Sequence, residues 1–224
     1  MNLSSSPEAR VSLRDKFRAA TREAILEAAA GLLNADGAVQ IRMEDIAARA
    51  GIAVGTLYNY FEDRTSLVTA LLETRTRSLF EALEAVAVKG QAAPAGRPES
   101  FTAELRDFIA AVVQHVNTNR FLFHLLIEDE RHNGLDARVL ARRQAVRGDL
   151  FVRTEVLMQR GIASRALRPG DAALYAAAVI GMVQGIVARA LVAGEPLTVE
   201  RQADIVSLFM TGAAHPGRQG QHEQ

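Results

Sequence analysis

The sequence predicts an all-α protein. Apolar residues recur at three- and four-residue spacing through most of the chain, which is the period of an amphipathic helix. No segment shows the apolar-polar alternation of a half-buried strand, and no internal repeat is present. Glycine, proline, asparagine and aspartate separate the periodic segments into individual helices. With 224 residues, 49% of them hydrophobic, the chain can form one ordinary domain or a small and a larger one.

The first helix is predicted to run from about Ser12 to Asn34. Ser12 and Asp15 have the spacing of a capping box, and Asp36-Gly37 ends the helix. Its apolar stripe consists of Phe17, Ala24, Ile25, Ala28, Leu32 and Leu33. We expect this helix to pack across the two that follow and to complete a small three-helix core.

The next two segments have the pattern of a helix-turn-helix. In residues 43–50, Ile46, Ala47 and Ala50 share one side of a short helix. Gly51 is expected to end that helix in the left-handed conformation, because glycine adopts it without a steric penalty. The small alanines allow the second helix to cross close by at a steep angle.

The second helix presents an unusual set of polar groups. Ile52, Leu57 and Phe61 are spaced to face inward, which leaves the hydroxyls and the amide of the segment partly outside. No acidic residue lies among them. Hydroxyl and amide groups suit contacts with phosphates and base edges, since they form hydrogen bonds without the repulsion that a carboxylate meets at DNA.

These residues resemble the TetR family of one-component transcriptional repressors. The resemblance rests on Asp45-Ile46-Ala47, Ala50-Gly51-Ile52 and Gly55-Thr56-Leu57-Tyr58-Asn59-Tyr60-Phe61, with Arg64 and Leu67 after them. It extends upstream through Arg22-Glu23-Ala24-Ile25-Leu26-Glu27-Ala28-Ala29 and Gly37, so it covers about residues 20–70. The family implies an all-α protein with an N-terminal three-helix DNA-binding domain and a larger helical ligand-binding and dimerisation domain.

Two features depart from the family pattern. Arg42 and Ala53 stand where the family usually has a serine or threonine at the start of each motif helix, and each change removes a side-chain cap typically worth roughly 1 kcal/mol. Val54 replaces a frequent lysine and removes one usual phosphate contact, whereas Arg64 keeps the charge of another.

From the resemblance and from side-chain chemistry we predict the residues that contact DNA. They are Arg42 beside the motif, Thr56, Tyr58, Tyr60 and Arg64 at phosphates, and Val54, Gly55 and Asn59 nearest the base edges. Between Glu8 and Arg22, five basic residues face only two acidic ones, Glu8 and Asp15. This segment is either a DNA-facing arm or a solvated helix start, and the two interpretations carry equal weight.

The remainder of the chain is predicted to be helical. Asp63 caps a long helix that runs from about Arg64 to Val88, and residues 89–98 have the composition of a loop. Further helices are expected at 101–118, 121–132, 136–160 and 171–194, with a last one at Val199–Met210. We therefore predict domains at 12–62 and 63–212, with disordered tails at 1–11 and 213–224.

The helix at 171–194 is interrupted only by Gln184 and Arg189 and is apolar enough to be mistaken for a membrane span. Arg189 is costly in lipid, and no charged anchor pattern flanks the segment. We expect instead a fully buried helix of a protein without a membrane span. Gly181 and Gly185 lie one turn apart and permit close approach of another helix, including the same helix of a second subunit.

Candidate ligand-binding residues are drawn from the apolar helices of the second domain. They are Phe108, His115, Phe123, Met158, Tyr175 and Met182, most of which are equally suited to a plain core. A hydrogen-bonded core histidine is the favoured alternative for His115 and His124. The basic run Arg138, Arg142, Arg143 and Arg147 is interpreted as an exposed helix face.

Composition limits the remaining function classes. No cysteine occurs, which excludes disulfides and thiolate metal sites. The polar N-terminus lacks the apolar segment of a signal peptide. We expect a cytoplasmic homodimeric repressor, not an enzyme, that needs no metal or cofactor, binds a palindromic DNA operator and is released by a small, mainly apolar ligand. A helical enzyme and a purely structural helical dimer are the alternatives.

Overall fold

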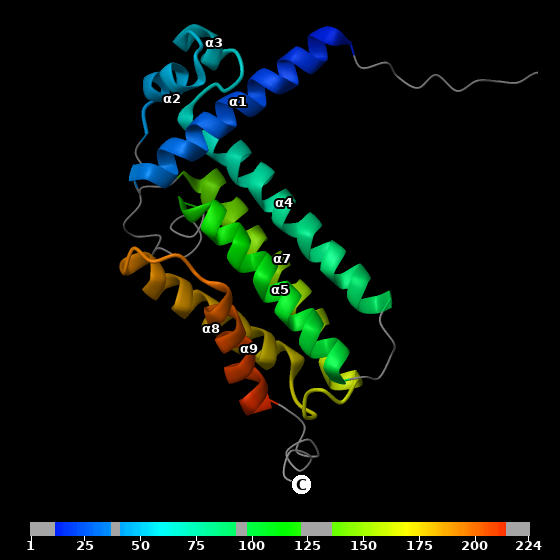
Figure 1. Cartoon of the computed structure of the whole chain (residues 1–224). Helices are drawn as coiled ribbons and strands as arrows, with labels where there is room; N and C mark the ends of the chain where they lie inside the picture. The colour runs from blue at the N-terminus through cyan, green and yellow to red at the C-terminus, as the bar shows by residue number, and fades with distance from the viewer. Residues whose placement is uncertain (1–11, 37–40, 93–97, 122–135, 214–224) are drawn as a thin grey trace, which may run out of the picture. The chain divides into compact units, whose positions relative to one another are not determined.

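The structure, a computed structural model, describes residues 12–36, 41–92, 98–121 and 136–213, and these residues contain helices and no strand. The helices in Figure 1 are α1 (Leu13–Asp36), α2 (Met43–Ala50), α3 (Val54–Tyr58), α4 (Arg64–Ala92), α5 (Pro98–Thr118), α7 (Ala137–Ala163), α8 (Ala172–Val192) and α9 (Val199–Ala213). The predicted all-α class is confirmed. The chain divides into two compact units, residues 1–71 and 72–224, and the boundary falls inside α4.

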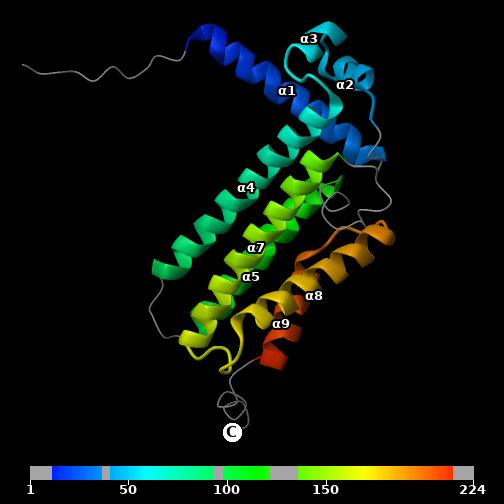
Figure 2. The ribbon, with the colours of Figure 1, turned by 180° about the vertical axis from the view of Figure 1, so that it is seen from behind.

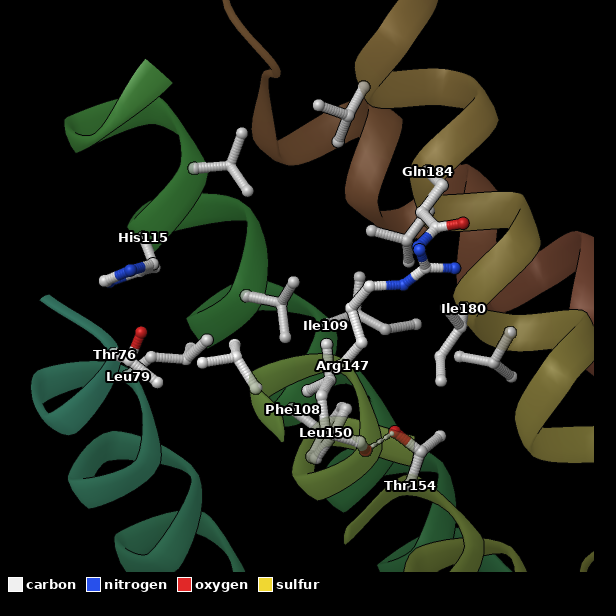
Figure 3. Close-up of a pocket in the computed structure, with 16 residues that line it drawn as sticks. Thr76, Leu79, Phe108, Ile109, His115, Arg147, Leu150, Thr154, Ile180 and Gln184 are labelled. Carbon is white, nitrogen blue, oxygen red and sulfur yellow. Dashed lines mark hydrogen bonds between the residues drawn. The ribbon is translucent and has the colours of Figure 1, made fainter. Parts of the chain in front are cut away.

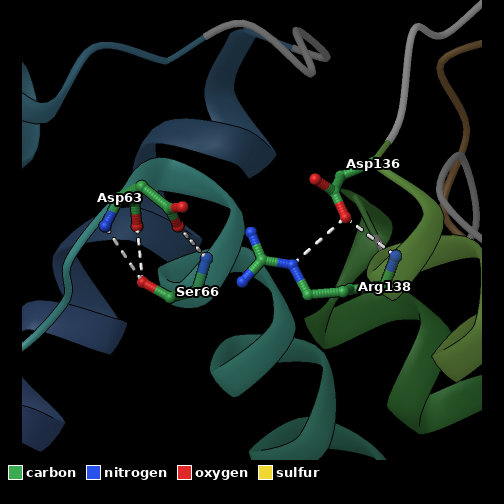
Figure 4. Close-up of polar contacts among 4 residues, drawn as sticks. All are labelled: Asp63, Ser66, Asp136 and Arg138. Atoms are coloured by element: carbon green, nitrogen blue, oxygen red, sulfur yellow. Dashed lines mark hydrogen bonds and ion pairs between the residues drawn. The ribbon is translucent and has the colours of Figure 1, made fainter.

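Aspartates cap three of these helices. Asp63 Oδ1 accepts from the N–H of Ser66 at 2.6 Å, and the Asp63 N–H donates to Ser66 Oγ at 3.2 Å (Figure 4). Asp136 Oδ1 accepts from the N–H of Arg138 at 2.8 Å. Asp171 accepts from the N–H two residues on at the same distance. Such caps satisfy amides that lack a partner inside the helix, so each of these three starts is specified locally.

The first unit has a small core of side chains from α1, α2, α3 and the first turn of α4. Its fully buried side chains include Ile25, Leu26, Ile46, Leu57 and Leu67. At the start of α1, the N–H of Asp15 donates to Ser12 Oγ at 3.1 Å, as the capping box predicts. The first two turns of α1 are exposed, including Leu13 and Phe17.

The core of the second unit lies where α7 packs against α8 and α5 packs against α9 (Figure 2). Leu105, Ile109, Leu157, Met158 and Val179 are almost completely buried at its centre. Polar contacts fix the helices around this core. The buried carboxylate of Glu104 on α5 forms an ion pair with the partly exposed Arg160 of α7. Asn117 exchanges two hydrogen bonds with the backbone of Leu197, at 2.9 and 3.3 Å.

Helix α4 is longer than predicted, because residues 89–92 are helical and α5 already begins at Pro98. Two contacts of α4 with α5 explain the extension. Lys89 Nζ lies 2.6 Å from Asp107 Oδ2, and Gly90 lies so close to the Glu104 carboxyl that an added Cβ would stand 2.3 Å from its carbon. Packing of the last turn against α5 therefore overrides the weak helix propensity of glycine.

From the sequence, the helix at 171–194 is expected to be fully buried. Helix α8 is not fully buried, so this expectation is wrong for the single chain. By length and composition it is apolar enough to cross a membrane, but only 28% of its most apolar window is buried. Tyr175, Ala176, Val179, Val183 and Val187 form its buried face. Leu174, Ala177, Gly181, Gly185 and Val192 are exposed on the other side. A helix on the edge of a core buries one stripe only, so the opposite apolar stripe stays uncovered.

The two glycines of α7 make a matched pair for testing the core. A Cβ at Gly161 would lie 2.6 Å from the ring of Phe101 and 2.8 Å from Leu167, whereas one at Gly148 would meet nothing within 4 Å. We expect Gly161→Ala to lower the free energy of unfolding by about 1–3 kcal/mol, because overpacking outweighs the gain in helix propensity. Gly148→Ala should raise it by up to about 1 kcal/mol. Urea unfolding measures both, and equal stabilisation by the two changes would contradict the packing.

Candidate nucleic-acid interface and ligand cavity

Gly51 forms the turn between α2 and α3. Its φ of 69° and ψ of 31° place it in the left-handed region, as predicted. The N–H of Gly51 donates to the carbonyl of Ala48 at 3.2 Å, and the N–H of Ile52 donates to that of Ala47 at 3.0 Å. These bonds satisfy the last carbonyls of α2, so the chain leaves the helix within one residue and α3 begins at Val54.

The helices of the motif start without side-chain caps, as Arg42 and Ala53 predict. Packing holds α3 in place instead: Leu57 is fully buried and Phe61 is 4% exposed. The guanidinium of Arg22 on α1 lies 5.2 Å from the centroid of the Phe61 ring, in cation–π geometry. The buried side chains of Leu57 in α3 and of Phe61 just after it therefore fix which residues of α3 face outward.

The structure leaves the predicted DNA-contacting residues at least partly accessible. Arg42, Gly55, Tyr58 and Asn59 are exposed, and Val54, Thr56, Tyr60 and Arg64 are partly buried. Asn59 and Tyr60 follow α3, which ends at Tyr58. No acidic residue occurs from Ala53 to Phe61. Burial lowers the pKa of Arg64 below its usual value, but the guanidinium stays charged at neutral pH.

Gly55 lies exposed in the first turn of α3. A Cβ there would meet no atom within 4 Å, and Gly55 is not among the residues with positive φ. Neither packing nor backbone conformation in this chain requires a glycine at this position. Its lack of a side chain leaves room for a close approach from outside, next to the hydroxyls of Thr56 and Tyr58.

The second unit contains a cavity between α4, α5, α7 and α8 (Figure 3). Its free volume is about 90 Å³. The walls are mainly apolar, and the polar side chains among them are Thr76, His115, Arg147, Thr154 and Gln184. The apolar lining residues are Leu79, Phe108, Ile109, Val112, Val116, Val146, Leu150, Val179, Ile180, Val183 and Val187. An apolar space with a few polar groups is the usual composition of a small-molecule site.

His115 lines this cavity from α5. Burial and the positive charge of Arg75 lower the pKa of His115 to about 4, so the imidazole is neutral at pH 7. His115 and Leu79 also line a second, more polar cavity of about 290 Å³ that includes Arg75. A neutral histidine at this boundary can donate one hydrogen bond and accept another.

The six predicted ligand-binding residues have different environments. Phe108 and His115 line the cavity. Met158 is fully buried in the core, and Tyr175 packs edge-on against Phe209 with ring centroids 6.2 Å apart. Met182 is partly buried against the same core, and Phe123 lies outside the described residues. Met158, Tyr175 and Met182 are therefore not among the lining residues of this cavity.

Arg147 and Gln184 line the cavity but were not predicted to bind a ligand. Gln184 had a usable signal, because it is one of two polar residues within the apolar run of α8. Arg147 was assigned with Arg138, Arg142 and Arg143 to an exposed basic face of α7. Arg138 and Arg147 are exposed as predicted, but Arg143 is only 3% exposed, so the assignment is wrong for that residue. Arg147 also lines the cavity. Which way each arginine turns depends on the packing of α7 and is not encoded in the charge pattern.

The first unit is defined by its fold as a helix-turn-helix domain, a class that binds DNA with the second helix of the motif. Residues 25–71 match the family described as "Bacterial regulatory proteins, tetR family". The resemblance of the sequence to the TetR family is thereby confirmed. No curated protein matches the chain.

Solved structures of transcription regulators and of a ligand complex are similar in fold to this chain. A TetR regulator from Haloarcula marismortui aligns with a TM-score of 0.70 and 16% identity, over 87% of this chain and 98% of its own. FadR from Bacillus subtilis in complex with stearoyl-CoA gives 0.67 and 16%, over 85% and 98%. A SmeT–triclosan complex gives 0.68 and 22%, over 88% and 93%. The likeness in fold therefore extends beyond the first unit and includes most of the second.

The low pKa of His115 makes folding stability depend on pH. In the unfolded chain histidine titrates near pH 6.5, and here the pKa is about 4, so the unfolded state binds more protons between these values. The contribution of the neutral His115 ring to the free energy of unfolding is therefore fully present above about pH 6.5, and it is lost as the pH falls toward 4. We expect wild type to lose about 1–2 kcal/mol more than His115→Asn between pH 7.5 and 5.0. Urea unfolding at both pH values measures this, and identical pH dependence would contradict the burial of a neutral ring.

Proposed function

We propose that the chain is a cytoplasmic homodimeric transcriptional repressor that binds a palindromic operator and is released by a small, mainly apolar ligand. The observation that carries the proposal is the continuity of α4. This helix begins at Arg64, beside the predicted DNA contacts, and contributes Thr76 and Leu79 to the wall of the ligand cavity. Helix α4 lies in the proposed ligand-binding domain at 63–212, directly follows the proposed DNA-binding domain at 12–62, and crosses the boundary between the two compact units at residues 71 and 72.

Contacts to DNA come from α3 and the residues around it. The hydroxyls of Thr56, Tyr58 and Tyr60 and the guanidinium of Arg64 supply phosphate contacts, with Arg42 nearby. Val54, Gly55 and Asn59 lie nearest the base edges. The exposed amide of Asn59 is the best candidate for direct readout, because an asparagine side chain can bond an adenine edge with two hydrogen bonds.

Selection from a random pool of DNA, followed by salt titration on the selected site, tests this assignment. Arg64→Ala should weaken binding to all sequences and flatten the slope of log K against log salt by about one unit, since one phosphate contact is lost. Asn59→Ala should change the preferred sequence and leave the salt slope unchanged. Arg106→Ala, on the exposed face of α5, is the control. The proposal is contradicted if the selection yields no preferred DNA sequence, or if neither substitution changes DNA binding.

A two-fold dimer is supported by the uncovered side of α8. Its exposed residues are small or apolar except Arg189, whose guanidinium lies 3.9 Å from the carboxylate of Glu195. A Cβ at Gly181 or Gly185 would meet nothing within 4 Å. Leu208 on α9 is 62% exposed and adds to the apolar surface. A second copy of α8 and α9 would cover these residues in an isologous contact. Two recognition helices spaced by one DNA turn, roughly 34 Å, then read a symmetric site.

Substituting one glycine of α8 tests the dimer contact. Gly181→Leu places a bulky side chain at the proposed interface and should weaken dimerisation at least tenfold without lowering monomer stability. Gly148→Leu adds the same side chain to an open position on α7 and should leave dimerisation unchanged. Analytical ultracentrifugation at micromolar concentration measures both. A monomeric wild type, or equal effects of the two variants, would contradict the assignment of the interface.

Release by an apolar ligand is supported by the cavity and by the ligands named for similar structures, stearoyl-CoA and triclosan. A free volume of about 90 Å³ is well below the roughly 300–1,000 Å³ of sites for drug-sized ligands. A ligand of that size must therefore push the surrounding helices apart, α4 among them. A ligand that binds the widened state 100-fold more tightly than the unwidened state supplies roughly 2.7 kcal/mol. This free energy favours the shift of α4 and of the recognition helices.

The alternatives of an enzyme and of a purely structural dimer have less support. The described residues contain no group of three or more side chains suited to hold a metal ion. A structural dimer does not need an exposed, carboxylate-free α3 or an apolar cavity. Retention of a specific inverted-repeat DNA separates the repressor from both alternatives, and turnover of an added metabolite would favour the enzyme.

A further inference from the structure

We propose that the cavity binds a monoanionic amphiphile, with its carboxylate at Arg147 and Gln184 and its aliphatic or aromatic body against the apolar walls. The inference rests on the proposed ligand-release function and adds the chemical class of the ligand. It follows from the charge of the lining, from hydrogen-bonding groups without partners and from the arrangement of polar and apolar side chains around the cavity.

The charge of the lining favours an anion. The described residues that line the cavity include one permanently charged side chain, the Arg147 guanidinium, and neither aspartate nor glutamate. His115 is neutral at pH 7, so it neither adds to nor offsets that charge. A cationic ligand would face Arg147 without a counter-charge. A carboxylate would instead gain a charge-assisted contact with a guanidinium, whose planar fork can donate two parallel hydrogen bonds.

Two lining side chains have unused hydrogen-bonding capacity. Within the described part of the chain, the side chains of Arg147 and Gln184 make no hydrogen bond and no ion pair. The hydroxyl of Thr154 differs, because it donates to the carbonyl of Leu150 at 2.8 Å. The guanidinium and the carboxamide therefore offer donors that water or a ligand must satisfy.

The arrangement of these groups gives the ligand a direction. Figure 3 shows Gln184 and the end of Arg147 on the α8 side of the cavity, with His115 and Thr76 on the α5 and α4 side. Arg147 is exposed and Gln184 is half-buried, so a carboxylate between them keeps part of its hydration. The apolar body would then lie against Ile109 and Val183. Partial hydration limits both the desolvation cost and the strength of the ion pair.

Three ligands with the same eight-carbon chain test the assignment: octanoate, octanol and octyltrimethylammonium. Isothermal titration of the full-length protein should show octanoate binding about five- to tenfold more tightly than octanol, with the ammonium compound weaker than both. Arg147→Gln should remove the preference for octanoate and change the affinity for octanol less than twofold. Arg147→Lys should keep part of the preference. Arg106→Gln, which removes an exposed arginine of α5 outside the cavity, should leave all three affinities unchanged.

The binding titration and the operator titration separate this inference from the proposed function. Equal affinities for octanoate and octanol, an unchanged preference in Arg147→Gln, or no binding of any of the three ligands would overturn the inference. A preference that depends on Arg147 but does not affect operator affinity would support the inference and contradict ligand-controlled release. If octanol releases the operator as readily as octanoate does, ligand-controlled release is supported and the inference of an anionic ligand is contradicted.

Discussion

The shared apolar core of α5, α7, α8 and α9 is the feature on which the second unit depends. Burial of Leu105, Leu157 and Met158 holds these helices together, since removal of apolar area from water is the main favourable contribution to folding. The same packing creates the cavity. Where α5 and α8 face each other, the lining consists largely of short valines, such as Val116 and Val187, which leave space that longer side chains would fill.

The DNA-binding unit relies on a different constraint, the turn at Gly51. A residue with a side chain is strained at a φ of 69°, so glycine at this position decides where α2 ends and α3 starts. The missing caps at Arg42 and Ala53 do not prevent either helix from forming, because Leu57 and Phe61 are buried against the rest of the unit. Tertiary packing commonly determines short helices in this way, since an isolated five-residue helix has almost no stability of its own.

Prediction from sequence succeeded where the determining interaction is local. The aspartate cap at Asp63, the capping box at Ser12 and the left-handed turn at Gly51 each depend on residues within one helical turn. It failed at residues 89–92, where the contact of Gly90 with Glu104 on another helix overrides propensity. The ligand cavity was predicted only in part: Phe108 and His115 line it, but Met158 and Tyr175 occupy the core, and the contribution of Arg147 to the lining was not predicted.

The sequence by itself determined the helical class, the helix-turn-helix and the outward polar groups of α3, because spacing, caps and glycine act through the local backbone. Only the tertiary structure decided which stripe of α8 is buried, which arginine of α7 enters the core and which faces the cavity, and how much space remains between α5 and α8. The physical reason is that an amphipathic pattern states which residues avoid water but not what covers them. A helix that is apolar all round, such as α8, gives no preferred face until its neighbours are in place.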